Sequence, residues 1–321
     1  MVKKPNLFDG KLFDVEHALD IFAYSYITIP AHEIYNTELL KDHEELLKKT
    51  HIYLVGYAPK VGLAKVEQID RKLLTHFTVG GDEVALDWEL PKGFDLKFEG
   101  ELFWVETPDG NRTFPNREAS IFRLHKKRHM LFDVKYIGQA YGENGDRNAL
   151  ERLTKHETLQ KIALQKTPDD HEIQVVLVEI QPNNHMMTVF NPWAETKDED
   201  GSRIKNALDS LFETSEAQQV SLYEAALIRY FQPEYNKVFK NSFPSTNLKI
   251  LEQCYDKDMA AVIAEFCIDE MPFFFRSDAV DPMPYHIAGY NIHEKQDRDI
   301  FFGYKSGSID NLASISDDDP Q

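Results

Sequence analysis

Cysteine is nearly absent from this sequence of 321 residues, which contains only Cys254 and Cys267. Two cysteines cannot form the disulfide network of a small secreted domain, and their spacing matches no zinc motif. No apolar run approaches the ~20 residues that a membrane helix needs. The N-terminal segment "MVKKPNLFDGKLFDV" has no continuous apolar core of signal-peptide length. We therefore expect a cytoplasmic protein with no membrane partner.

Basic residues are also scarce, since 36 Lys and Arg stand against 54 Asp and Glu, for a net charge of −18. An acidic surface repels phosphate backbones, so the average charge argues against a nucleic-acid partner. The charge is uneven, however, because residues 116–166 contain 11 basic and 6 acidic side chains. This basic stretch leaves nucleic-acid binding open, although an ordinary solvated surface would give the same pattern.

Hydrophobic residues make up 42% of the chain and aromatic residues 12%, which predicts a folded and partly β protein. The N-terminal part, residues 1–115, predicts a mixed α/β domain. We expect helices over residues 14–26 and 36–51 and a strand over residues 51–58. Short apolar runs over residues 74–105 are separated by Gly and Pro, which predicts an antiparallel meander. The function of this part is unknown, and it can hold a protein partner or a self-association surface.

The middle part, residues 116–245, predicts the element order β-β-α-β-α. The third strand is continuously apolar, which places it in the centre of its sheet. The C-terminal part, residues 246–321, predicts a β-hairpin and an acidic, polar tail. The fold class is therefore α+β, with a small mixed or antiparallel sheet flanked by helices. The five elements of the middle part are expected over residues 120–125, 132–140, 146–165, 172–180 and 221–231.

Several polar residues in the middle part can support chemistry. Arg152 and His156 are four residues apart, so they share one face of the predicted helix. An arginine fork binds phosphate oxygens, and histidine moves protons near neutral pH. An exposed helix surface is the alternative interpretation. Glu224 can bind a hard divalent cation through oxygen, but with Ser221 it also matches the Ser-x-x-Glu capping box, which needs no metal.

Tyr136 and Gly138 close the second predicted strand as Tyr-Ile-Gly, and Asn236 follows the last helix. Together with Arg-x-x-x-His and the later glutamate, this ordered set resembles the GIY-YIG nuclease superfamily over residues ~118–240. The spacing is most similar to that of its restriction endonucleases. The resemblance implies catalytic roles for Tyr136, Arg152, His156, Glu224 and Asn236.

The resemblance also implies a mechanism. Glu224 would hold one Mg²⁺ or Mn²⁺, and Arg152 would offset charge at the attacked phosphorus. Tyr136, helped by His156 or Lys135, would orient or deprotonate water, and Asn236 would fix the geometry. The first-strand motif, normally Gly-Ile-Tyr, falls on Ser120-Ile121-Phe122, where Phe122 has no hydroxyl. Four basic residues are expected to contact nucleic acid: Lys126, Lys127, Arg128 and Lys155.

The predicted function is a metal-dependent endonuclease that hydrolyses phosphodiester bonds in DNA, with RNA not excluded, in defence against foreign DNA. Phe122 and the acidic flanks favour an alternative, a catalytically impaired binding or regulatory module on the same fold. A third interpretation is a nuclease inhibited by its own acidic C-terminal part.

Overall fold

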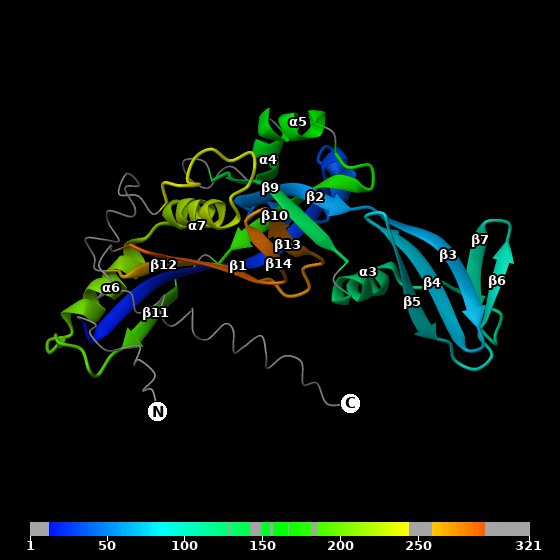
Figure 1. Ribbon diagram of the computed structural model, residues 1–321, viewed down its shortest axis with the longest axis horizontal. Helices are drawn as coiled ribbons and strands as arrows, with labels where there is room; N and C mark the ends of the chain where they lie inside the picture. Colours follow the sequence, from blue (N-terminus) through cyan, green and yellow to red (C-terminus); the bar gives the residue numbers. More distant parts are fainter. Residues whose placement is uncertain are drawn as a thin grey trace, which may run out of the picture.

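The computed structural model is built on one mixed β-sheet of nine strands (Figure 1). The sheet follows the path β14-β13-β9-β2-β10-β1-β12-β15, and β11 pairs with the first part of β1. Most neighbours are antiparallel, but β1 is parallel to β12 and β9 is parallel to β13. The structure describes residues 13–127, 129–141, 149–154, 157–165, 167–181, 185–243 and 259–292. The strands are β1 (Val15–Pro30), β2 (Ile52–Pro59), β9 (Leu131–Gln139), β10 (His171–Ile180), β11 (His185–Phe190), β12 (Ala261–Phe266), β13 (Phe274–Ser277), β14 (Val280–Met283) and β15 (His286–Asn291).

Helices cover both faces of this sheet, and β10 shows the consequence most clearly. Val176 and Val178 of β10 pack into the larger apolar cluster beneath α7 (Glu216–Phe231). Val175 and Leu177 point to the opposite face, into a smaller cluster beneath the other helices. A strand with both faces buried has to be apolar throughout, so the predicted central strand is confirmed. The smaller cluster is covered by η1 (Ala31–Glu33), α1 (Thr37–Lys41), α2 (Glu44–Leu47), α4 (Ala149–Leu153) and α5 (Glu157–Leu164).

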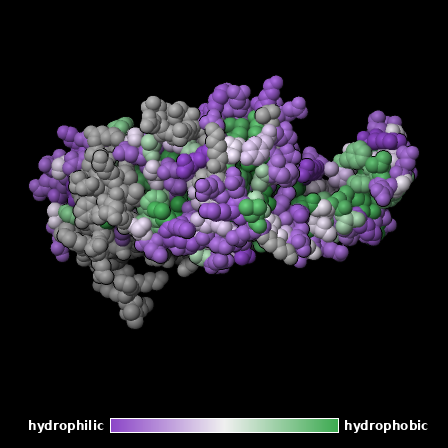
Figure 2. Space-filling model, turned by 90° about the horizontal axis from the view of Figure 1, so that it is seen from above, coloured by the Kyte–Doolittle hydropathy of each residue, from purple (hydrophilic) through white to green (hydrophobic). Residues whose placement is uncertain are grey.

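A separate unit of two three-stranded antiparallel sheets is inserted between β2 and β9. Figure 2 shows this inserted unit standing apart from the main sheet and joined to it by a narrower connection. Its own core includes Val66, Leu73 and Val105, and the predicted meander strands are confirmed within it. Its strands are β3 (Val61–Ile69), β4 (Lys72–Val79), β5 (Asp82–Glu89), β6 (Asp95–Glu99), β7 (Leu102–Glu106) and β8 (Arg112–Thr113).

Two predicted elements are wrong in type. From Val15 on, the residues of the predicted helix over 14–26 form part of the long strand β1, because they lie between β10 and β11 on one side and β12 on the other and pair with all three strands. Residues 120–125 belong to a helix, α3 (Arg117–Lys126). The Asn116 side chain caps it by accepting hydrogen bonds from the backbone N–H groups of Glu118 and Ala119. Ser120 and Leu124, one turn apart, form its buried face.

The protein is of the α+β class, as predicted, but the expectation of a small sheet is wrong because nine strands share it. The division at residues 115 and 245 does not follow this sheet. β1 and β2 from the first part and β12 to β15 from the last part pair with one another and with strands of the middle part. The remaining helix, α6 (Ser202–Glu213), packs near β1 and β11.

Candidate active site

Two tyrosines from neighbouring strands meet on one face of the main sheet. Tyr53 of β2 lies opposite Gly138 of β9, and its ring centroid is 6.0 Å from that of Tyr136. The register shifts along this pair, since Val55 opposes Tyr136 but Gly56 opposes Val134. Tyr136 lies on the same face as Tyr53 because it opposes Val55, and the β-bulge at Lys135 places Val134 on the opposite face.

Gly138 is required by the close approach of Tyr53. A Cβ atom on Gly138 would lie 2.5 Å from both Cζ and the hydroxyl oxygen of Tyr53 and 2.9 Å from Cε1 of Tyr136. Tyr53 is fully buried, so its ring cannot move aside cheaply. The glycine of the predicted Tyr-Ile-Gly motif therefore gives the two tyrosine rings their space.

Arg152 approaches the same tyrosines from α4. Its neighbour Leu153 is buried, and the backbone N–H of Ala149 at the start of α4 donates to Thr50 O at 2.9 Å, which ties the helix to the chain entering β2. Arg152 is exposed, but its guanidinium lies close enough to the two phenols to lower the pKa of both Tyr53 and Tyr136. The two tyrosines and Arg152 are therefore electrostatically coupled.

Glu224 reaches the site from the middle of α7. The capping interpretation of this glutamate is wrong, because α7 begins at Glu216 and its capping box is formed by Ser215 and Gln218. Glu224 instead approaches Gln139, the last residue of β9, whose side chain and backbone N–H both lower the pKa of the carboxylate.

Asn236 holds the strand that carries Tyr136. Its Oδ1 accepts from the Ile137 backbone N–H at 2.9 Å, and its Nδ2 donates to Ile137 O at 2.8 Å. Tyr235 N also donates to Lys135 O at 3.0 Å. Within the described residues, β13 pairs with β9 only as far as Asp133. Asn236 and Tyr235 thus satisfy backbone groups at the edge of β9 that β13 leaves open.

The tyrosines and the carboxylate share a buried environment that disfavours charge. Burial raises the pKa of Glu224 to about 7, against the opposing charge of Arg152 and the hydrogen bonds from Gln139. Burial also raises the pKa of Tyr53 well above its ordinary value, and Tyr136 adds to the effect while Arg152 opposes it. Burial and the charge of Glu224 raise the pKa of Tyr136. The interactions place all four side chains in one electrostatic unit.

Phe122 is not the partner of Tyr136. It lies on α3 with 51% of its surface exposed, at a groove of about 1060 Å³ that Tyr26 and Met271 also line. Tyr53 occupies the expected place instead. The sequence had a signal for it, since His51-Ile52-Tyr53 differs from Gly-Ile-Tyr only at the first position and begins a strand that was predicted.

The predicted basic residues make different contacts in the structure. Lys135, the bulge residue, is 3.1 Å from the carboxylate of Asp133 and 3.6 Å from that of Glu234. Burial opposes its charge, but the hydrogen bond and charge of Asp133 and the charge of Glu234 raise its pKa overall, so Lys135 is not a proton acceptor near neutral pH. Lys127 donates to Ala85 O of the inserted unit at 2.8 Å, and Lys126 lies over the Phe122 ring. Three predicted site residues lie outside the described residues: Arg128, Lys155 and His156.

The donor set around Glu224 fits one divalent cation held by a single carboxylate. The carboxylate is removed from solvent and disfavoured as an anion, and a cation would reverse that preference. Among the residues described, no three His, Cys, Asp or Glu side chains gather into a metal-binding group. Mg²⁺ does not need such a group, because it keeps several waters and takes one or two carboxylates.

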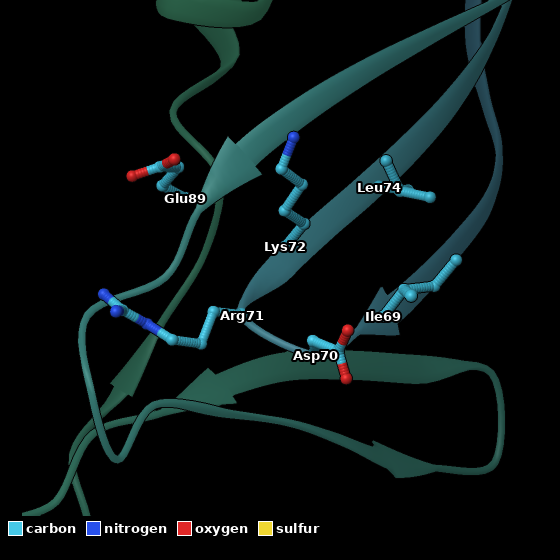
Figure 3. A pocket seen from close by; sticks show the side chains of 6 residues that line it. All are labelled: Ile69, Asp70, Arg71, Lys72, Leu74 and Glu89. Carbon is cyan, nitrogen blue, oxygen red and sulfur yellow. The ribbon is translucent and has the colours of Figure 1, made fainter.

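One described cavity lies far along the chain from these residues, in the inserted unit. It has a volume of about 360 Å³ and lies around the turn from β3 to β4, and none of its lining residues is a predicted site residue (Figure 3). Its lining consists of Ile69, Asp70, Arg71, Lys72, Leu74 and Glu89.

Comparison with protein-family models, curated proteins and solved structures gave no match for this chain. Among the described helices, none combines the length and the apolar character that crossing a bilayer requires. Function is therefore inferred from the chemistry of the site.

Proposed function

We propose that this protein is a metal-dependent endonuclease of the GIY-YIG type that hydrolyses phosphodiester bonds in DNA. One observation carries the proposal. Tyr53, Tyr136, Arg152 and Glu224 come from four different elements and are electrostatically coupled to one another, with the two tyrosine rings 6.0 Å apart. Core packing alone gives no reason to bury a carboxylate, an arginine contact and two phenols together, because such groups are costly to remove from water.

Each side chain has a chemical role in this proposal. Glu224 would hold Mg²⁺ or Mn²⁺, which when bound polarises a phosphate oxygen and stabilises the leaving oxygen. Arg152, exposed on α4, donates hydrogen bonds to a phosphate oxygen as negative charge develops there. Tyr53 and Tyr136, whose raised pKa values keep both phenols neutral, orient the attacking water with their hydroxyl groups.

Asn236 fixes the geometry of the site in this proposal, and it does so through the main chain of β9. Both polar atoms of its side chain are bonded to the main chain of Ile137. It therefore fixes the strand segment next to Tyr136, and its influence on the phosphate is indirect.

The alternative of an impaired binding module loses its main support. That interpretation depended on a phenylalanine in place of the first tyrosine, and Tyr53 supplies the hydroxyl beside Tyr136. A regulatory protein has no need to keep a buried carboxylate whose pKa is raised to about 7. The proposal of a role in defence against foreign DNA depends on analogy with restriction enzymes.

The test is cleavage of supercoiled plasmid DNA by the full chain, with Mg²⁺, Mn²⁺ or EDTA. We expect nicked and linear products only with metal. Glu224→Gln and Tyr53→Phe should each lower the rate by roughly 10²–10⁴, the usual contribution of a positioned catalytic group. Tyr24→Phe is the matched control, since Tyr24 is an exposed tyrosine of β1 outside the site. Equal rates for wild type and Glu224→Gln would refute the proposed site.

A further inference from the structure

Gln139 is the residue through which the end of β9 reaches the carboxylate of Glu224. It follows Gly138 directly and pairs with Ile52 of β2. Its main chain is fixed on both sides, because Ala140 N donates to His51 O at 2.8 Å and Ile137 is held by Asn236. The Gln139 side chain therefore extends from a point that the sheet holds in place.

The amide of Gln139 joins two positions of α7. Its Nε2 lies 3.3 Å from the Ser221 hydroxyl oxygen, and its Oε1 lies 3.4 Å from the same atom. The hydroxyl has one proton, and its shortest contact is the 2.9 Å bond that it donates to Ala217 O. Ser221 is thus an acceptor for one N–H of the amide. That leaves the other N–H for Glu224, which lies one helical turn further along the same face of α7 and whose pKa the amide lowers.

We infer that Gln139 is a positioning residue, whose amide holds the Glu224 carboxylate in the orientation that binds a divalent cation. The inference rests on the proposed function. A glutamate side chain has three rotatable torsions, and Arg152 attracts the same carboxylate. Without the amide, the carboxylate is free to turn toward Arg152 and away from the position of the metal. Hydrogen-bond partners of metal ligands typically contribute 10–100-fold to metal affinity or activity.

The test is direct measurement of Mn²⁺ binding to the full chain, with electron paramagnetic resonance counting the free ion. Gln139→Met keeps the length of the side chain but removes both polar atoms. We expect it to raise the Kd for Mn²⁺ by about 10–100-fold. Cleavage should then need more Mn²⁺ for half-maximal rate, while the rate at saturating Mn²⁺ falls less. A change confined to packing would not affect the Mn²⁺ concentration needed for half-maximal rate more than the rate at saturating Mn²⁺.

Two further variants complete the design. Ser221→Ala removes the second anchor of the amide and should shift the Kd in the same direction by a smaller factor, because the bond to Glu224 remains. Gln68→Met is the matched control, since Gln68 accepts a hydrogen bond from Leu96 N in the inserted unit at 2.6 Å, outside the site. It should leave the Kd for Mn²⁺ unchanged. Urea unfolding of each variant shows that the chain is folded.

The outcomes separate the inference from the proposed function. A folded Gln139→Met with the wild-type Kd overturns the inference, while Glu224-dependent cleavage by the wild type leaves the proposed function standing. If Gln139→Met does not fold, Ser221→Ala decides in its place, and an unchanged Kd overturns the inference. Equal losses of Mn²⁺ affinity in Gln139→Met and Gln68→Met also overturn the inference. A wild type that neither binds Mn²⁺ nor cuts nucleic acid overturns both.

Discussion

Replacing the buried carboxylate of Glu224 by an amide should make the protein more stable at alkaline pH. Glutamate has an ordinary pKa of 4.5, and burial raises the pKa of Glu224 to about 7 in the folded chain. Between these two values the folded state binds a proton that the unfolded state releases. Stability therefore falls as pH rises through this range, and the cost is complete above pH 7.

The size of the effect follows from the two pKa values. Each pH unit between them is worth 1.36 kcal/mol, so the ionised carboxylate destabilises the fold by about 3 kcal/mol at pH 8. At pH 5 most of that cost is gone, and about 1 kcal/mol is left. Glu224→Gln resembles the protonated acid, because it is neutral and has nearly the same shape. The free energy of unfolding of Glu224→Gln should therefore exceed that of the wild type by about 3 kcal/mol at pH 8 and about 1 kcal/mol at pH 5.

The assay is urea unfolding at pH 8 and pH 5 with EDTA present. Glu83→Gln, at an exposed position on β5, is the control and should show no such pH dependence. Adding Mg²⁺ at pH 8 should stabilise the wild type but not Glu224→Gln, since a ligand stabilises only the state that binds it. A Glu224→Gln protein that is less stable than wild type by the same amount at both pH values would refute the reasoning.

Further expectations concern the neighbours of Glu224. Gly138→Ala should destabilise the fold by about 1–3 kcal/mol in thermal unfolding, because its Cβ would overlap the buried ring of Tyr53. Asn236→Ala should cost about 1–3 kcal/mol in urea unfolding, since it leaves the N–H and C=O of Ile137 without their partner; a loss below 0.5 kcal/mol would contradict this. Tyr136→Phe should lower the cleavage rate by roughly 10²–10⁴ with the urea midpoint little changed. Binding of DNA, measured by fluorescence anisotropy, should weaken steeply with salt if phosphates are contacted.

Local pattern was a good guide wherever the chain makes its contacts locally. The meander strands of the inserted unit alternate and are joined by short turns, so their sequence gives both their type and their order. The polar residues on α4 and α7 were likewise identified from their spacing. The site residues Tyr136, Arg152 and Glu224 do lie together in the structure.

Predictions from the sequence pattern were wrong where pairing between residues far apart in the chain decides the structure. The apolar spacing of residues 14–26 suits a helix, but their pairing with β10 and β12 requires a strand. Tyr53 was missed because its partner strand was sought next to β9 in the sequence, whereas more than 70 residues separate β2 from β9. The bulge at Lys135, which places Val134 and Tyr136 on opposite faces, is visible only in the register of the two strands.

The position of the inserted unit bears on the order in which the protein folds. Pairing β2 with β9 closes a loop from Pro59 to Leu131, and each doubling of an unstructured loop costs about 0.6 kcal/mol of closure entropy. Each strand of the unit pairs with its neighbour in sequence, so the unit has low contact order and can form early. Once folded, it places residues near its two ends close together, as the bond from Gly80 N to Lys60 O and the contact of Lys127 with Ala85 O show. Early folding of the inserted unit therefore brings β2 and β9, the two strands that carry Tyr53 and Tyr136, close to each other.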